Sequence, residues 1–329
     1  MVIVGNRHDT KKLPENKLEA AIEKLTEIKR ESEKEKTRSV PECPKCGRAQ
    51  IVRNGHQSGK QQYKCKGCGC CFVETTGSAI AHSHSGETVW KQVIKDTLEG
   101  VAIDNTAATL DLHHETVFNM RHKILYCLEQ EQANNPKPLE GVCEADETYI
   151  LESVKGRKIP YDYHRKARKH GAKAEKRGIS NEYICVCAAV ERNGTAFSTA
   201  INRATPSKAE LLNVFGERVN ANTFLLCDGS KNYAVLSENG KCITANAISG
   251  KAAGLNNINA VNGYHCFIKE RYRNARGFAT IYLNRYNALF STAFRASDSV
   301  VNYIHTLLSA MNGTFTSIAV SQTSNLLAL

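Results

Sequence analysis

Two aspartates of this 329-residue sequence lie at positions in predicted strands where a carboxylate could bind a ligand. Asp146 is inside the strand-like segment VCEADETYI, and a carboxylate removed from water must be paired, neutralised or bound to a metal. By period-two alternation Glu144 shares the face of Asp146, whereas Glu147 is expected on the other face. Asp228 ends the apolar run FLLC, and functional groups in α/β sheets cluster at the carboxyl ends of strands.

Two such acids favour divalent metal ions bound through oxygen. Two metals about 3.5 to 4 Å apart can activate a nucleophile and stabilise the leaving oxygen of an in-line phosphodiester displacement. Taken alone, Asp146 is also compatible with an exposed edge strand, and Asp228 with the start of a turn. The pair is therefore a candidate magnesium site that needs a third oxygen ligand.

Four of the 13 cysteines have the spacing of a zinc site. The pattern is C-x2-C-x18-C-x2-C and predicts one structural Zn²⁺, with the intervening RNGHQSGKQQY as a hairpin. The predicted ligands are Cys43, Cys46, Cys65 and Cys68. So short a segment buries too little apolar surface to fold without the metal. Cys70 and Cys71 are expected to be spare thiols.

The segment NNINAVNGYHCFIKERYRN, residues 256–274, has the apolar spacing of an amphipathic helix. Its N-terminal half holds four asparagines and no carboxylate, and Asn256 or Asn257 is expected to cap the helix. One face of this helix carries Asn262, His265, Cys266, Lys269 and Arg273, and an adjacent apolar face carries Val261, Tyr264, Ile268 and Tyr272. A cation-bearing stripe of this kind suits a helix beside a phosphate backbone.

The elements around these residues predict an α/β domain. Three strand patterns follow one another, in VCEADETYI, EYICVCAAVE and TAFSTAINR; then come a helix near 206–218, the strand TFLLCD, a short helix, the strand KCITAN and the asparagine-rich helix. This is the order of an RNase H-like mixed sheet, although order alone also allows another α/β sheet.

Residues 87–130 are expected to be helical, in an order that resembles a helix-turn-helix. Arg121 and Lys123 on its last helix would then be candidate DNA contacts, and a plain three-helix bundle is the alternative. The predicted divisions are a charged helix in 1–40, a zinc ribbon in 41–80, the helical region in 81–135, a catalytic domain in 141–295 with a basic insertion at 152–180, and a C-terminal helix and tail in 296–329.

Basic residues are gathered in patches, and the net charge is +11. The insertion 152–180 is rich in lysine and arginine and is expected either to become ordered on DNA or to remain a solvated loop. The candidate DNA contacts outside the helical region are Lys155, Arg157, Lys158, Arg165, Lys166, Arg168, Lys169, Lys269 and Arg273. No apolar run is long enough to cross a membrane, so a cytoplasmic location without a membrane partner is expected.

Several of these motifs together resemble the insertion-sequence transposases of the DDE superfamily, in the ISXO-like branch with an N-terminal zinc ribbon. The resemblance is carried by YKCKGCGCCFVETTGSAI, EADETYI, CDGSKNY and the asparagine-rich helix. In that branch the third motif resembles H-x-N-x-x-E/N-G-F/Y, which places Asn262 at the third position of a D-D-E or D-D-N triad. Asn257 stands in place of the histidine, and His265 in place of the usual aromatic residue. Glu270 as the third ligand, or no third ligand, are the alternatives.

The resemblance implies a DNA transposase that binds terminal inverted repeats and catalyses cleavage and strand transfer. Asp146, Asp228 and Asn262 would hold two Mg²⁺ ions, for which Mn²⁺ can substitute. Pairing of two element ends implies a homodimer or a larger assembly on DNA. A zinc-dependent DNA-binding regulator with an inactive RNase H-like domain is the alternative, and a structure-specific nuclease is a third possibility.

Overall fold

The computed structural model describes residues 42–310, apart from 58, 82, 157–158, 160–162, 164–165, 167–172, 177, 193, 204, 248–253, 255, 276 and 298. The chain divides into two compact units, Met1–Thr76 and Gly77–Leu329, and each is described by itself. The predicted charged helix in 1–40 lies outside the described residues.

The first unit is a small three-stranded antiparallel sheet in the order β1-β2-β3. Its strands are β1 (Ile51–Gln57), β2 (Lys60–Cys65) and β3 (Cys71–Val73). The β1–β2 hairpin is the one expected from the sequence, and it turns through Gly59, whose φ of 78° is readily adopted only without a side chain. The buried apolar cluster consists of Cys43, Cys65 and Phe72, with Tyr63 stacked on Phe72. This core is too small to hold the unit together by apolar burial alone.

The second unit is built on a five-stranded mixed sheet in the order β6-β5-β4-β7-β8. Its strands are β4 (Leu139–Leu151), β5 (Tyr183–Glu191), β6 (Ala196–Asn202), β7 (Val219–Cys227) and β8 (Ile243–Asn246). The first three are antiparallel neighbours, whereas β7 and β8 run parallel to β4. This is the RNase H-like arrangement predicted from the order of the elements.

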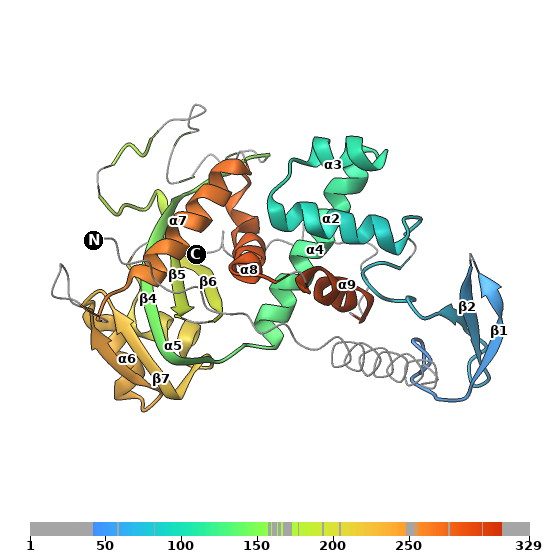
Figure 1. Cartoon of the computed structure of the whole chain (residues 1–329), viewed down its shortest axis with the longest axis horizontal. Coiled ribbons are helices and arrows are strands. Elements are labelled where there is room, and N and C mark those ends of the chain that lie inside the picture. The colour runs from blue at the N-terminus through green and yellow to red at the C-terminus, as the bar shows by residue number, and fades with distance from the viewer. Residues whose placement is uncertain are drawn as a thin grey trace, which may run out of the picture. The chain divides into compact units, whose positions relative to one another are not determined.

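The second unit also contains helices, of which some cover the two faces of this sheet and others pack on those helices. They are α2 (Glu87–Glu99), α3 (Ile103–Leu110), α4 (His114–Asn134), α5 (Lys208–Phe215), η1 (Lys231–Tyr233), α6 (Ala234–Glu238), α7 (Asn259–Asn274), η3 (Thr280–Tyr282), α8 (Leu283–Ala293) and α9 (Val300–Ala310). Figure 1 shows α7 crossing in front of β4 and β5, with which it is in contact. Among the described residues no helix has the length and apolar character needed to span a membrane.

The interior strand β5 explains the two layers of helices. Its sequence YICVCAAVE is almost continuously apolar, as expected for a strand buried on both faces. Val186 and Ala188 join the core that includes residues of α4, α7 and α8, whereas Cys187 and Ala189 join the core formed with α5 and α6. Period-two alternation therefore assigns the even-numbered residues of β4, including Asp146, to the α7 side.

The predicted helical region does not have a core of its own. Trp90 on α2 and Ile124 on α4 belong to the same buried cluster as Val186 of the sheet. The expected boundary near 135–141 is thus a connection within one compact unit. The predicted C-terminal helix is α9, which makes its main contacts with α2 and α4. Its apolar face, which includes Ile304 and Leu308, completes this helical layer.

Candidate active site and metal centres

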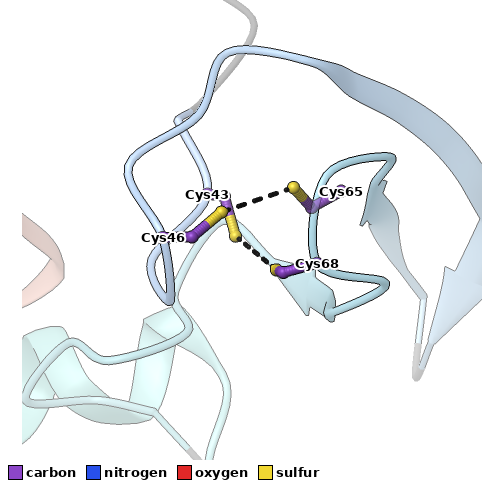
Figure 2. A group of neighbouring side chains, drawn as sticks. All are labelled: Cys43, Cys46, Cys65 and Cys68. Atoms are coloured by element: carbon purple, nitrogen blue, oxygen red, sulfur yellow. Dashed lines mark hydrogen bonds between the residues drawn. The ribbon is translucent and has the colours of Figure 1, made fainter.

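The four cysteines of the zinc pattern lie together in the first unit (Figure 2). The Sγ atoms of Cys43 and Cys68 are 3.6 Å apart, and those of Cys46 and Cys65 are 3.7 Å apart. Four thiolates at 2.3 Å from one tetrahedral zinc ion would be separated by about 3.8 Å. The donor set and its spacing therefore fit a single tetrahedral Zn²⁺. Cys70 and Cys71 are not part of this cluster.

Two predicted acids are brought together in the second unit by the pairing of β4 with β7. Ala145 pairs with Cys227, so that Asp146 and Asp228 follow on neighbouring parallel strands. Asp228 ends β7 in a tight turn, where its Oδ1 accepts a hydrogen bond from the Ser230 amide at 3.1 Å. One carboxylate oxygen each from Asp146, Glu147 and Asp228 lies within 4.8 Å of the others. Three oxygen donors of this kind are suited to a hard divalent cation.

Glu147 is the member of this cluster that the sequence analysis did not select. Alternation predicts that it points away from the Asp146 side, and its neighbour there is indeed Tyr233. Past Ala145, however, β4 continues without a β7 partner, because β7 ends at Cys227. The open edge lets successive β4 side chains from both faces approach Asp228. The end of the apolar run FLLC was the only sequence signal for this gap.

The carboxylate cluster is electrostatically strained without a cation. Burial raises the pKa of Asp146 to about 6, and the charge of Asp228 adds to this effect. Burial also raises the pKa of Glu147 to about 7, with further contributions from Asp146 and Asp228. In the described part of the chain, no lysine or arginine forms a salt bridge with any of the three. Glu147 Oε1 is also buried and has no hydrogen-bond partner among the residues that the structure describes. These features fit a site that binds metal ions.

The raised pKa values predict how the metal-free protein responds to pH. Between about pH 4.5 and 7 the folded state retains protons on Asp146 and Glu147 that the unfolded chain has released, so its free energy of unfolding falls as pH rises through this window. We expect Glu147→Gln to raise that free energy by about 1 kcal/mol at pH 8, after allowance for solvent screening, and to leave it unchanged at pH 4.

Urea unfolding in Mg²⁺-free buffer measures this difference, and the fluorescence of the single tryptophan provides the signal. Trp90 is buried in the core of the second unit and therefore reports its unfolding. Addition of Mg²⁺ at pH 8 should reverse the order and make the wild type the more stable protein. A Glu147→Gln variant that is less stable than wild type in Mg²⁺-free buffer at pH 8 would contradict the proposed repulsion.

Helix α7 faces the acids from the other side. His265 Nδ1 lies 3.7 Å from Asp146 Oδ2, and Lys269, one turn further along, acts to lower the pKa of Asp146. Asn262 is exposed and precedes His265 by three residues, which places it on the same face of the helix. The apolar face predicted for this helix is buried as expected, through Val261, Tyr264, Ile268 and Tyr272.

The alternative third ligand, Glu270, does not join the carboxylate cluster found among the described residues. It lies eight residues after Asn262, about 12 Å along the helix axis. His265 is neutral at physiological pH, since burial and then the charge of Lys269 lower its pKa to about 4. Its Nε2 is buried and has no hydrogen-bond partner. The helix thus presents a neutral, polar stripe next to Asp146, followed by cations.

The candidate DNA contacts have different surroundings. Arg121 is half-buried, and its Nη2 donates to the Val101 carbonyl oxygen at 2.8 Å. Burial lowers the pKa of Lys123, which is also half-buried. Arg121 therefore helps to hold α4 against the turn after α2, and its contact with DNA stays a prediction. The hydrogen bond to Val101 depends on a residue 20 positions away and leaves no local signal in the sequence.

On α7, Lys269 and Arg273 are exposed, and neither forms an ion pair with another described residue. Lys166 is exposed, and Lys155 Nζ donates to the Gly277 carbonyl oxygen at 2.9 Å. The other predicted contacts of the basic insertion lie outside the described residues, and they are Arg157, Lys158, Arg165, Arg168 and Lys169.

The RNase H-like sheet thus brings Asp146 and Glu147, inside β4, next to Asp228, which directly follows β7. Residues 138–296 match the model of the ISXO2-like transposase domain. The resemblance predicted from the motifs is confirmed for this part of the chain. The matched range includes Asp146, Glu147, Asp228 and Asn262.

A curated relative is an uncharacterized protein in transposable element ISH50 of Halobacterium salinarum. It is 25% identical over 198 residues, which cover 60% of this chain and 64% of the relative. The chain thus matches less than two thirds of that protein's length.

Two solved structures are similar at a lower level. The Mos1 strand transfer complex has a TM-score of 0.30 and 13% identity, covering 69% of this chain and 77% of that one. A pre-cleavage Mos1 transpososome has a TM-score of 0.27 and 11% identity, covering 66% and 77%. Similarity this low gives no information about individual residues.

Proposed function

We propose that this protein is the transposase of an insertion sequence, which binds the terminal inverted repeats of its element and then cleaves and joins DNA. The observation that carries the proposal is the convergence of Asp146, Glu147 and Asp228 where β4 passes the end of β7, within an ISXO2-like transposase domain. The relative in transposable element ISH50 supports this proposal.

Asp146 and Asp228 would hold two Mg²⁺ ions, with the side-chain carbonyl oxygen of Asn262 as the third protein ligand and Mn²⁺ as a possible substitute. When bound, the ions supply Lewis-acid activation of the attacking oxygen and stabilise the leaving oxygen. Glu147 contributes negative charge from the opposite face of β4. Asn262 contributes no charge, so the third carboxylate of the cluster compensates in part for the amide.

The reaction consists of two phosphodiester exchanges without a covalent enzyme intermediate. In the first, water forms a bond to phosphorus at the element end as the bond to the 3′ oxygen breaks, which leaves a 3′-hydroxyl and a 5′-phosphate. In the second, that 3′-hydroxyl forms a bond to a target phosphorus and displaces a target 3′-hydroxyl. The exposed cations of α7, Lys269 and Arg273, are positioned on the helix to contact the DNA backbone.

The remaining parts of the chain would recognise the DNA. The Cys₄ unit binds one structural Zn²⁺ and, with the helical region of α2, α3 and α4, contacts the inverted repeats. Both ends of the element must be held during transfer, so the active assembly contains at least two copies of the chain.

A strand-transfer assay tests this proposal. The protein, Mg²⁺, a labelled DNA fragment that carries the inverted repeat flanking the gene, and a target plasmid are incubated together. Joined products with the repeat's 3′ end linked to plasmid DNA are expected. Specific binding of the repeat without cleavage, in Mg²⁺ and in Mn²⁺, would contradict the proposal and indicate the alternative function, a zinc-dependent DNA-binding regulator. Cleavage of branched DNA without joining would indicate a structure-specific nuclease.

A further inference from the structure

Glu144 is a buried carboxylate that the proposed chemistry does not use. It lies on β4 two residues before Asp146, and only 1% of its surface is exposed. Its Oε2 accepts hydrogen bonds from the Ala260 amide at 2.6 Å and the Val261 amide at 3.1 Å. Its Oε1 accepts one from Arg192 Nε at 2.6 Å. Both oxygens are therefore occupied, and the charge is fully partnered.

These contacts account for the first turn of α7. The first amides of a helix have no partner within the helix, and Ile258 at the N-cap offers no side-chain acceptor. Asn257 Oδ1 accepts from the Asn259 amide at 3.1 Å, which gives this asparagine part of the capping role expected from the sequence. The next two amides are bound by Glu144, and the Asn262 amide donates to the Ile258 carbonyl oxygen at 3.1 Å. The helix is thus capped largely from β4.

Arg192 connects this cap to a third element. It follows the end of β5, and its amide donates to the Val142 carbonyl oxygen of β4 at 3.1 Å. Its Nη2 donates to the Asn257 carbonyl oxygen at 2.8 Å, just before α7. The Glu144–Arg192 pair therefore ties β4, β5 and the start of α7 together. A negative charge at a helix N-terminus is also favoured by the helix dipole.

The hydrogen bonds of Glu144 and Arg192, here called the clamp, connect the strand that carries Asp146 with the first turn of α7. Glu144 and Asp146 are on the same face of one strand, about 7 Å apart along it. Val261, bound by Glu144, immediately precedes Asn262. We propose that Glu144, held by Arg192, is a positioning residue that keeps Asn262 within ligand distance of the metal ions bound by Asp146. This inference rests on the proposed function.

Two amide substitutions separate positioning from general stability. Glu144→Gln keeps the shape but turns an NH₂ group toward donors, so that one side of the clamp loses its acceptor. Glu152→Gln is the matched control, because Glu152 is 2% exposed, follows the same strand and pairs with Arg203 Nη2 at 2.7 Å. Both changes remove a buried charge beside an arginine, and only the first touches α7's cap.

Two readouts are measured on the full-length protein after confirming the fold by circular dichroism. The first is hydrogen exchange of the peptide that covers residues 258–264. The second is Mn²⁺ affinity by electron paramagnetic resonance, with Asp146→Asn as the variant that reports the site. We expect Glu144→Gln to lose protection in that peptide and to bind Mn²⁺ about tenfold more weakly, and Glu152→Gln to match wild type in both. In an Asn262→Ala background, Glu144→Gln should weaken Mn²⁺ binding no further.

Three results would overturn the positioning role. Unchanged protection in Glu144→Gln would show that the clamp does not hold α7. If Glu144→Gln lost hydrogen-exchange protection in residues 258–264 but bound Mn²⁺ with wild-type affinity, Glu144 would be only a helix cap. This conclusion requires that Asp146→Asn weakens Mn²⁺ binding. Additive losses with Asn262→Ala would mean that Glu144 acts elsewhere. If Asp146→Asn itself bound Mn²⁺ like wild type, the metal site would be misassigned, and the proposed function would fail together with this inference.

Discussion

Asp228→Asn is expected to abolish DNA cleavage, lowering the single-turnover rate by about 10³-fold or more while the protein stays folded. The physical reason is that Asp228 supplies one of three converging carboxylates, and metal-ion stabilisation of a phosphodiester transition state contributes several kcal/mol. An exposed aspartate at a strand end can become an amide with little loss of packing. Asp146→Asn should give a similar loss for the same reason.

The measurement is cleavage of repeat-bearing DNA in Mg²⁺ at saturating protein, with DNA affinity determined separately by gel shift. Glu270→Gln is the matched control on the exposed surface of α7, and it should cleave at the wild-type rate. An active Asp228→Asn enzyme would refute the site assignment. An inactive Glu270→Gln enzyme with intact folding would instead indicate that Glu270 is the third metal ligand.

The second large effect concerns zinc. Cys65→Ser is expected to eliminate the single bound Zn²⁺ and to unfold the first unit, because its apolar cluster is only Cys43, Cys65 and Phe72 with a few flanking side chains. Metal binding supplies about 10 to 16 kcal/mol in small zinc modules, far more than this cluster can. The affinity of the protein for the inverted repeat should fall when the first unit unfolds. The second unit has separate cores, so its unfolding temperature should not change.

Zinc content by elemental analysis, susceptibility of residues 42–76 to proteolysis, and thermal unfolding followed by Trp90 fluorescence test these expectations. Cys71→Ser is the control, since Cys71 is exposed on β3 and outside the cluster. It should keep one Zn²⁺ per chain. A Cys65→Ser protein that retains stoichiometric zinc and a protease-resistant first unit would exclude the four-cysteine site.

Features that depend on local spacing could be predicted from the sequence. The two C-x2-C pairs predicted which four cysteines lie together, because each pair forms its own turn. Alternation and length give the strands, and the apolar stripe of α7 gives its buried face. The same patterns singled out Asp146 and Asp228. Asp146 is a charged residue inside a predicted strand, and Asp228 is a charged residue at the end of one.

Features that depend on long-range pairing could not be predicted. Glu147 reaches the cluster only because β7 stops at the residue opposite Ala145, and no local pattern gives that register. Alternation places Glu144 on the face of Asp146, but no local pattern shows that it caps a helix 116 residues away. The hydrogen bond from Arg121 to the Val101 carbonyl oxygen, 20 residues away, likewise has no local signal in the sequence. In each case the partner is set by tertiary packing.

The proposed active site depends most on Asn262 as its third metal ligand, and one assay tests this role directly. Cleavage and strand transfer on repeat-bearing DNA in Mg²⁺ are compared for wild type, Asn262→Ala and Asn262→Glu. An amide oxygen that binds metal predicts an alanine variant at least about tenfold slower and a glutamate variant that remains active, since a carboxylate restores the ligand and adds charge. An Asn262→Ala enzyme with wild-type cleavage and transfer would contradict the assignment of a D-D-N active site.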